Sequence, residues 1–433
     1  MASNLFKPGF LGLLTTQFFG AMNDNVLKGV LTFMVIDGVW EGKLPGGQGF
    51  VGVCFTVPFI LLSGFAGQVA DRHSKSRVAF WAKVAEVPIA IVGAIGFFVG
   101  NVWITLLSLI ALTCQSSIFG PAKYGMIPEV VEEADLSRAN GSINMMTNIA
   151  VIVGTFVAGL TSDVYSPQGA GQGVAWMPGL VLVLVAIAGV GSAMLMPVLP
   201  AGKKNIKYTL NPFATYMKTI VEMSKTRLLM VIMAWGYFYL LAGLALFIVP
   251  KYTVVLGINR TEASILMGVL GVAIGVGSGV AGLISGRRIE PRLIPVGAAG
   301  LVLFFTLLAA VPPTLPEMRL GLRVACSSVA AFVFGAGFSA GFYIIPLQAL
   351  LQKLSPEADR GRFLGTANAV SFGFLTLASL LYIVIRPLYG DEPQKMFYVS
   401  SVLMAVGATF FLWRLRGTGV FTGGAKLASG ESN

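Results

Sequence analysis

Twelve long apolar segments follow one another along the 433-residue chain and leave little room for other structure. A helix needs ~20 mostly apolar residues to cross a bilayer, and each segment meets that length. Only 11% of the residues are charged, against roughly 25% in soluble domains, so lipid is the expected solvent. We therefore predict an all-α membrane protein. The predicted spans are 9–37, 48–70, 78–100, 103–127, 141–163, 176–197, 228–250, 262–286, 292–312, 321–347, 364–386 and 396–414.

The longest hydrophilic interruption divides the spans into six and six. We predict an N-terminal six-helix bundle at 1–199, a cytoplasmic linker at 200–227, a C-terminal six-helix bundle at 228–416 and a flexible cytoplasmic tail at 417–433. Part of the linker, 211–225, either forms an amphipathic helix on the inner membrane surface or is a plain connection. The first apolar segment is too long for a cleavable signal peptide and lacks a small-residue cleavage site.

An internal repeat supports the division into halves. Residues 133–144 read EADLSRANGSIN and residues 357–368 read EADRGRFLGTAN, and both fit E-A-D-x-x-R-x-x-G-x-x-N. The second copy begins 224 residues after the first, between the equivalent spans of each half. This predicts two halves in the same orientation, related by an axis along the membrane normal.

The repeated motif places charges where two helices begin. We expect Asp135 and Asp359 to cap free backbone N–H groups at these helix starts. Arg138 and Arg362 lie one turn further along and should pair with acidic partners across the loop. Either these residues only stabilise the helix ends, or they also form inner-gate contacts that break during transport.

The basic excess reports membrane topology. With the N-terminus inside, 20 Lys and Arg residues lie on the cytoplasmic side and seven on the opposite side, which predicts two cytoplasmic termini. A concentrated soluble basic face is lacking, so nucleic-acid binding is excluded. The only histidine, His73, lies in a loop, and the three cysteines lie in apolar segments without a CxxC pair. We therefore predict no enzyme activity, catalytic residue, metal site or cofactor.

The first span contains an unusually polar stretch, QFFGAMNDNVLK, at Gln17–Lys28. Asp24 lies ~22 Å along a helix that starts near residue 9, which is past the centre of the ~30 Å hydrocarbon core. An ionised residue there costs ~3 kcal/mol. Asp24 and Lys28 have the spacing of an intrahelical ion pair. An ion pair between Asp24 and Lys28 would not explain Asn23 and Asn25. The alternative is that the polar stretch forms a functional site.

Other spans carry further polar residues that favour a functional site in the membrane. The predicted binding residues are Gln17, Asn23, Asp24, Asn25, Lys28, Glu86, Gln115, Lys123 and Gln348. An intramembrane charge that faces a cavity indicates a substrate or ion pathway.

Several motifs resemble a known family. GQVADRHSKSR, residues 67–77, is similar to the loop signature of the major facilitator superfamily, although Ser74 stands where that family usually has Gly. The other four are Gln17–Lys28, FGPAKYGMIPE at 119–129, RANG at 138–141 and IIPLQALLQ at 344–352. Together the motifs resemble the bacterial lysophospholipid transporters of this superfamily, and also the transporter-like N-terminal part of bifunctional acyltransferase fusions.

The resemblance implies the superfamily fold, with 12 transmembrane helices in two six-helix halves. It implies gating contacts at Asp71, Arg72 and Arg77 beside the residues of the repeated motif. Spans 1, 4, 7 and 10 of this fold line a central cavity, which would bring most of the predicted binding residues together. The family tends to carry a basic residue in its seventh span, whereas Met233–Pro250 has no charge here.

The implied function is a flippase that moves lysophosphatidylethanolamine-like lipids to the inner leaflet by alternating access. Asp24 would meet the ammonium of such a lipid, and Lys123 or Lys28 its phosphate. The implied setting is the bacterial inner membrane, where the protein would act as a monomer alongside membrane lipids and an acyltransferase. The alternatives are a proton-coupled exporter of another amphiphile, such as a drug or siderophore, and a transport-inactive docking module. A membrane acyltransferase is disfavoured because no H-x-x-x-x-D motif occurs.

Overall fold

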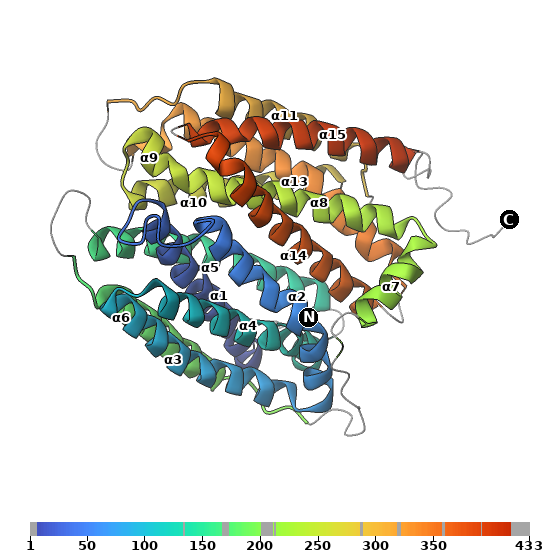
Figure 1. Cartoon of the computed structure of the whole chain (residues 1–433). Coiled ribbons are helices and arrows are strands. Elements are labelled where there is room, and N and C mark those ends of the chain that lie inside the picture. The colour runs from blue at the N-terminus through green and yellow to red at the C-terminus, as the bar shows by residue number, and fades with distance from the viewer. Residues whose placement is uncertain are drawn as a thin grey trace. The chain divides into compact units, whose positions relative to one another are not determined.

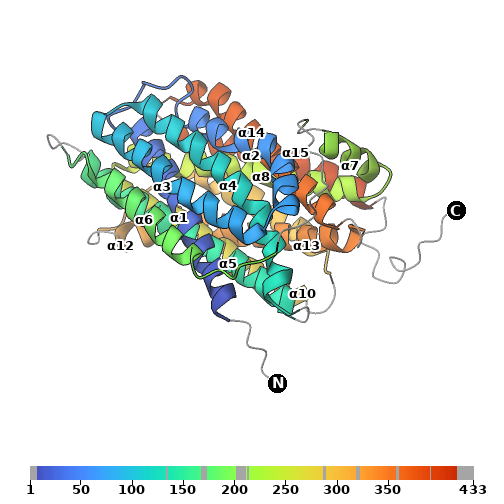
Figure 2. The same ribbon diagram turned by 90° about the horizontal axis from the view of Figure 1, so that it is seen from below.

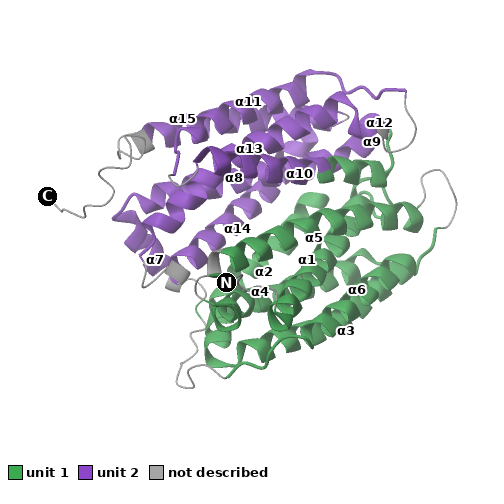
Figure 3. Ribbon diagram, turned by 180° about the vertical axis from the view of Figure 1, so that it is seen from behind, with its two compact units in different colours: residues 1–215, 257–268 green, residues 216–256, 269–433 purple. Residues whose placement is uncertain are grey.

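The structure is a computed structural model of the whole chain (Figure 1). It describes residues 7–132, 135–166, 173–200, 211, 214–285, 289–317, 322–356, 360–390 and 392–416. The chain forms two compact helical units (Figure 3). Unit 1 comprises residues 1–215 and 257–268, and unit 2 comprises residues 216–256 and 269–433.

Unit 1 contains the first six predicted spans. Its helices are α1 (Pro8–Ile36), α2 (Gln48–Arg72), α3 (Lys75–Val99), α4 (Val102–Val130), α5 (Leu136–Tyr165) and α6 (Met177–Ala193). Helix α1 packs against α5 and α6, α3 packs against α4 and α6, and α2 packs against α4 (Figure 2). The centre of this packing is apolar and includes Phe10, Leu13 and Met126.

Unit 2 contains the remaining spans. A short helix, α7 (Ala214–Ser224), precedes these spans. The elements after it are α8 (Leu228–Ile248), η2 (Val249–Lys251), α9 (Tyr252–Leu256), α10 (Arg260–Ser285), α11 (Leu293–Ala310), α12 (Leu322–Ala325), α13 (Ser328–Leu354), α14 (Arg360–Ile385), η4 (Arg386–Leu388), η5 (Pro393–Met396) and α15 (Phe397–Arg416). The first turns of α10 belong to unit 1. Ten of the described helices have the length and hydropathy of a membrane span, and α6 is a shorter apolar helix.

The same packing pattern occurs in both units. Helix α8 contacts α14 and α15 as α1 contacts α5 and α6, and α11 contacts α13 and α15 as α3 contacts α4 and α6. Helices α10 and α13 touch through glycines, because a Cβ on Gly277 would lie 2.1 Å from the Phe338 carbonyl oxygen. This contact corresponds to that between α2 and α4. The repeated pattern agrees with the predicted fold of twelve spans in two six-helix halves.

One predicted span is displaced along the chain. The tenth was expected at 321–347, whereas α13 is Ser328–Leu354. The Ser327 side chain accepts a hydrogen bond from the Ala330 N–H and so caps the helix at this later position. At the other end, the helix continues through Gln348 and Lys353, because polar side chains do not interrupt its backbone hydrogen bonds.

A buried arginine holds the start of α10 within unit 1. The Arg260 side chain is 1% exposed, and its Nε lies 3.1 Å from the Asp37 carboxylate. Its guanidinium also donates to the Asp37 and Ser162 carbonyls, at 3.0 and 3.1 Å. The Asp163 carboxylate accepts the Arg260 backbone N–H at 3.1 Å. This network joins the ends of α1 and α5 to the start of α10.

An aromatic cluster lies beside the last turns of α1, α3 and α5. Trp40 is fully buried, stacks on Phe97 with 5.4 Å between centroids, and donates its indole N–H to the Gly100 carbonyl at 2.9 Å. The Tyr165 hydroxyl donates to the Phe97 carbonyl at 2.8 Å. These contacts close this end of the bundle with a packed apolar layer.

A short helix forms within the predicted linker. Helix α7 buries Tyr216, Thr219 and Met223 and exposes Met217 and Val221. The exposed apolar pair is typical of a helix that lies at a membrane surface, and that location stays a prediction. Residues 201–210 and the tail at 417–433 lie outside the described residues.

An ion pair attaches α7 to α14. Arg362 donates to the Glu222 carboxylate at 2.6 Å, so its acidic partner lies on α7 and not, as expected, across the loop before α14. The hydrogen bond from Arg362 holds the pKa of Glu222 below its ordinary value, and Lys218 and Lys225 add to this effect. Because the pKa is lowered in the folded state, the contact stabilises the attachment above the ordinary glutamate pKa and weakens as pH falls through the lowered value.

We predict that acid releases α7. Protection of its amides against hydrogen exchange should be constant from neutral pH down to about 4.3, the ordinary glutamate pKa, and fall below that value. Glu222→Gln should remove this transition. Glu392→Gln is the matched control, because it breaks another ion pair, with Lys395, outside α7. An acid transition that persists in Glu222→Gln would contradict the assignment.

Candidate functional site

The polar stretch of α1 faces α4 through Asp24. Its two carboxylate oxygens lie 3.0 and 2.9 Å from the Ser116 hydroxyl oxygen. That oxygen also lies 3.2 Å from the Gln115 side-chain oxygen, so the hydroxyl can donate to either neighbour. Asp24 is half-buried, and Ser116 fixes its position relative to α4.

The two lysines among the predicted binding residues, Lys28 and Lys123, contact aromatic rings. The Lys28 ammonium lies 4.7 Å from the centre of the Phe55 ring, and the Lys123 ammonium lies 4.4 Å from that of Tyr124. Within the described part of the chain, neither lysine nor Asp24 has an ion-pair partner within 4.0 Å. The intrahelical pair of Asp24 and Lys28, one of the two readings of their spacing, is therefore not formed.

A second set of charges is sealed inside the bundle. The Lys83 ammonium lies 2.6 Å from the Glu86 carboxylate, and both side chains are 1% exposed. The Asn23 amide donates to the other Glu86 oxygen at 2.7 Å. Lys83 also lies over the Phe119 ring, 4.8 Å from its centre. Glu86 is thus enclosed by partners from α1 and α3.

A glycine makes room for this buried pair. A Cβ on Gly20 would lie 2.1 Å from the Lys83 nitrogen, so a larger residue on α1 would displace the ammonium. The sequence indicated Glu86 in the third span as one of several polar groups that could contact the asparagines of the first span, but its pairing with Lys83 was missed. The i,i+3 spacing of opposite charges on α3, together with Gly20 on a neighbouring span, was the available signal.

Three further predicted binding residues have partners within unit 1. Gln17 donates to the Thr147 hydroxyl on α5 at 2.9 Å, and Asn25 donates to the Ala21 carbonyl at 2.7 Å. Gln115 donates to the Ala82 carbonyl on α3 at 2.9 Å. Gln348 is half-buried on α13 and belongs to unit 2. A ligand-binding role for these residues stays a prediction.

The predicted gating residues lie at one end of each unit. Asp71 and Arg77 are exposed at the junction of α2 and α3, and Arg72 is half-buried there. The Lys75 ammonium pairs with Glu129, a contact that joins the start of α3 to the end of α4 and that the sequence did not reveal. Asp359 lies outside the described residues.

The capping role predicted for Asp135 is wrong. Asp135 occupies the N-cap position of α5, but its side chain makes no capping hydrogen bond. Its carboxylate pairs instead with Arg138 at 3.2 Å, one turn along the helix. Its backbone is in the helical region, with ψ of −1°, rather than in the extended conformation that most N-cap residues adopt.

Two repeated six-helix bundles with charges inside the first are typical of membrane transporters. Residues 13–379 match the Major Facilitator Superfamily. A lysophospholipid transporter LplT of Cronobacter sakazakii is 30% identical over 386 residues, which is 85% of each chain. One from an Enterobacter species is 27% identical over 424 residues, 95% of each chain. The chain belongs to the major facilitator superfamily and, within it, to the bacterial lysophospholipid transporter family.

Solved structures show the same fold. A POT family transporter gives a TM-score of 0.70 at 12% identity, with 96% of this chain and 97% of that chain covered. The xylose transporter XylE from E. coli gives 0.66 at 13% identity, with 98% of each chain covered. A bacterial homologue of the human lysosomal transporter Spinster gives 0.67 at 13% identity, covering 95% of this chain and 98% of that one. The protein is accordingly a multi-pass membrane protein.

We predict that Lys83 and Glu86 act as one structural unit. Glu86→Gln leaves a buried ammonium without its counter-ion and should lower the free energy of unfolding by ~3–5 kcal/mol. The double variant Lys83→Met, Glu86→Leu replaces both charges with apolar groups and should be more stable than either single variant. Thermal unfolding in detergent measures this. Glu132→Gln, which breaks an exposed pair with Lys7, is the control; strictly additive losses in the double variant would refute the coupling.

Proposed function

We propose that the protein moves lysophospholipids, chiefly lysophosphatidylethanolamine-like species, to the inner leaflet of the bacterial inner membrane by alternating access. The full-length similarity to lysophospholipid transporters supports the substrate class. The proposed activity is transport without a chemical step. An acyltransferase would act on the delivered lipid, the protein would work as a monomer, and both termini would be cytoplasmic.

One contrast in unit 1 carries the proposal. Lys83 and Glu86 satisfy each other, whereas Asp24, Lys28 and Lys123 have no ion-pair partner within 4.0 Å among the residues described. Unpaired charges inside a membrane are costly, so their retention needs a reason. A zwitterionic headgroup supplies both missing partners, because its ammonium suits Asp24 and its phosphate suits the lysines.

The remaining candidates have positioning roles in this proposal. Ser116 orients the Asp24 carboxylate, Gln115 offers the same hydroxyl a second acceptor, and Asn23 joins α1 to the buried Glu86. Gln17 joins α1 to α5, Asn25 bonds within α1, and Gln348 on α13 stays a predicted binding residue. Asp71, Arg72, Arg77, Asp135, Arg138, Asp359 and Arg362 are proposed to act in gating.

We predict that Asp24→Asn abolishes transport of labelled lysophosphatidylethanolamine and leaves the folded fraction unchanged. The variant removes the counter-charge for the ammonium, which contributes ~1.5–3 kcal/mol as a charge-assisted hydrogen bond. The amide keeps the side-chain size and its contact with Ser116. Glu41→Gln, which neutralises an exposed carboxylate in the loop after α1, should transport normally.

The same assay distinguishes the alternative function. Transport that stops when an uncoupler collapses the proton gradient would favour a proton-coupled exporter, and so would failure to move any lysophospholipid. Wild-type transport by Asp24→Asn would remove Asp24 from the proposed binding site.

We predict that Lys28 and Asp24 each contact the lipid headgroup and do not serve only to neutralise each other. Lys28→Gln and Lys123→Gln should each weaken lysophosphatidylethanolamine binding, and the double lysine variant should lose nearly all of it. If Lys28 served only to neutralise Asp24, the variant with both Asp24→Asn and Lys28→Gln would recover transport, since no buried charge would be left uncompensated. A double-mutant cycle measures this coupling, and such recovery would refute the headgroup role of both residues.

A further inference from the structure

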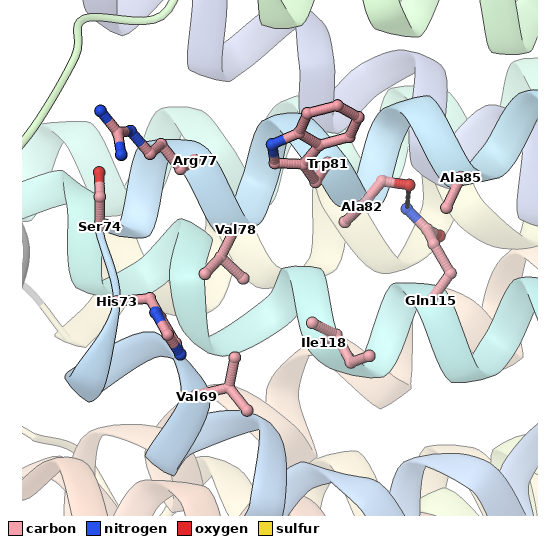
Figure 4. Close-up of a pocket in the computed structure, with 10 residues that line it drawn as sticks. All are labelled: Val69, His73, Ser74, Arg77, Val78, Trp81, Ala82, Ala85, Gln115 and Ile118. Atoms are coloured by element: carbon pink, nitrogen blue, oxygen red, sulfur yellow. Dashed lines mark hydrogen bonds between the residues drawn. The ribbon is translucent and has the colours of Figure 1, made fainter. Parts of the chain in front are cut away.

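A groove lies on unit 1 between the end of α2, the first half of α3 and the middle of α4. It has a volume of about 540 Å³. Its lining residues are Val69, His73, Ser74, Arg77, Val78, Trp81, Ala82, Ala85, Gln115 and Ile118 (Figure 4). The groove shares Gln115 with the candidate binding residues, and Arg77 is also a proposed gating residue.

One face of α3 forms the length of the groove. Arg77, Trp81 and Ala85 follow at intervals of four residues, so they lie in a row of ~12 Å along the helix. All three are exposed, and Trp81 is 65% exposed. An exposed tryptophan near the end of a membrane span is typical of the lipid headgroup level.

The groove is polar at one end and apolar along the rest. Figure 4 shows His73, Ser74 and Arg77 at one end, with the Arg77 guanidinium and the His73 ring on opposite sides of the start of α3, and Trp81, Ala85 and Ile118 further along. Arg77 and His73 supply the ionisable groups of the lining, and none of its residues carries a carboxylate. This pattern matches an amphiphile with an anionic head and an apolar chain.

The polar end is held in a fixed shape. The Ser74 hydroxyl donates to the Leu199 carbonyl at 2.6 Å, and the Leu199 N–H donates to the Ser76 hydroxyl at 2.9 Å. Lys75 pairs with Glu129 at the end of α4, so this carboxylate is already neutralised. The rim is thus anchored to the chain after α6 and to the end of α4 before any ligand arrives.

We propose that this groove binds an anionic phospholipid of the surrounding bilayer, with the phosphate at Arg77 and one acyl chain along Val78, Trp81 and Ala85. We favour an anionic over a zwitterionic lipid, because the ammonium of a zwitterionic lipid would find no carboxylate in the lining. The guanidinium of Arg77 presents paired N–H groups to phosphate oxygens. This inference is independent of the proposed transport function.

The test measures lipid retained by the purified protein. Protein extracted from vesicles of equal phosphatidylglycerol and phosphatidylethanolamine is examined by native mass spectrometry, and phosphatidylglycerol should be enriched. Arg77→Gln should reduce its retention about fivefold, the loss expected for one basic residue near an anionic headgroup. Arg227→Gln, at an exposed arginine outside the groove, should retain it normally.

A second variant tests the apolar part without changing any charge. Ala85→Phe fills the groove and should reduce retention as strongly as Arg77→Gln, whereas Ala405→Phe, at an exposed alanine on α15, should not. Equal retention of the two lipids, or equal loss in Arg77→Gln and Arg227→Gln, would overturn the proposal. Normal retention by Ala85→Phe, or displacement of phosphatidylglycerol by stoichiometric lysophosphatidylethanolamine, would also overturn it.

Discussion

The hydrocarbon layer contains no water to solvate a charge, so each charged side chain there depends on partners that the protein provides. Unit 1 meets this constraint in two ways. Lys83 and Glu86 neutralise each other out of contact with solvent. Asp24 has a serine hydroxyl, and Lys28 has an aromatic ring, a contact worth ~0.5–2 kcal/mol. The weaker partners leave those charges available to a ligand, whereas the strong pair contributes to the packing of α1 on α3.

The opposite end of unit 1 is organised around a different kind of contact. Arg260 reaches backbone carbonyls as well as carboxylates, so its binding depends on how α1 and α5 end and not only on side-chain identity. Asn259 and Glu262 form reciprocal hydrogen bonds with each other's backbone N–H, which stabilises the first turn of α10. The helix that leads into unit 2 therefore starts from a fixed position in unit 1.

Hydropathy and the internal repeat predicted an all-α membrane protein in two similar halves, because span length and apolar composition are set by the bilayer itself. The superfamily fold followed from the resemblance of the motifs. Span boundaries failed where a local cap decides them, as at Ser327, or where polar residues continue a helix, as at Gln348. The sequence indicated the residue types of the candidate site but not the side chains that each residue contacts. Which face of α3 carries Glu86 depends on how the helix is rotated, and rotation follows from small residues such as Gly20 on its neighbours.

The enclosure of Lys83 restricts how this region can change over evolutionary time. Loss of Glu86 first would strand a buried ammonium, and enlargement of Gly20 first would press against the same nitrogen. Loss of Glu86 alone is expected to give a less stable protein, whereas joint replacement of both charges leaves no unpaired ammonium. The three positions are therefore expected to be inherited together, and related chains should carry either the whole set or an apolar replacement of it.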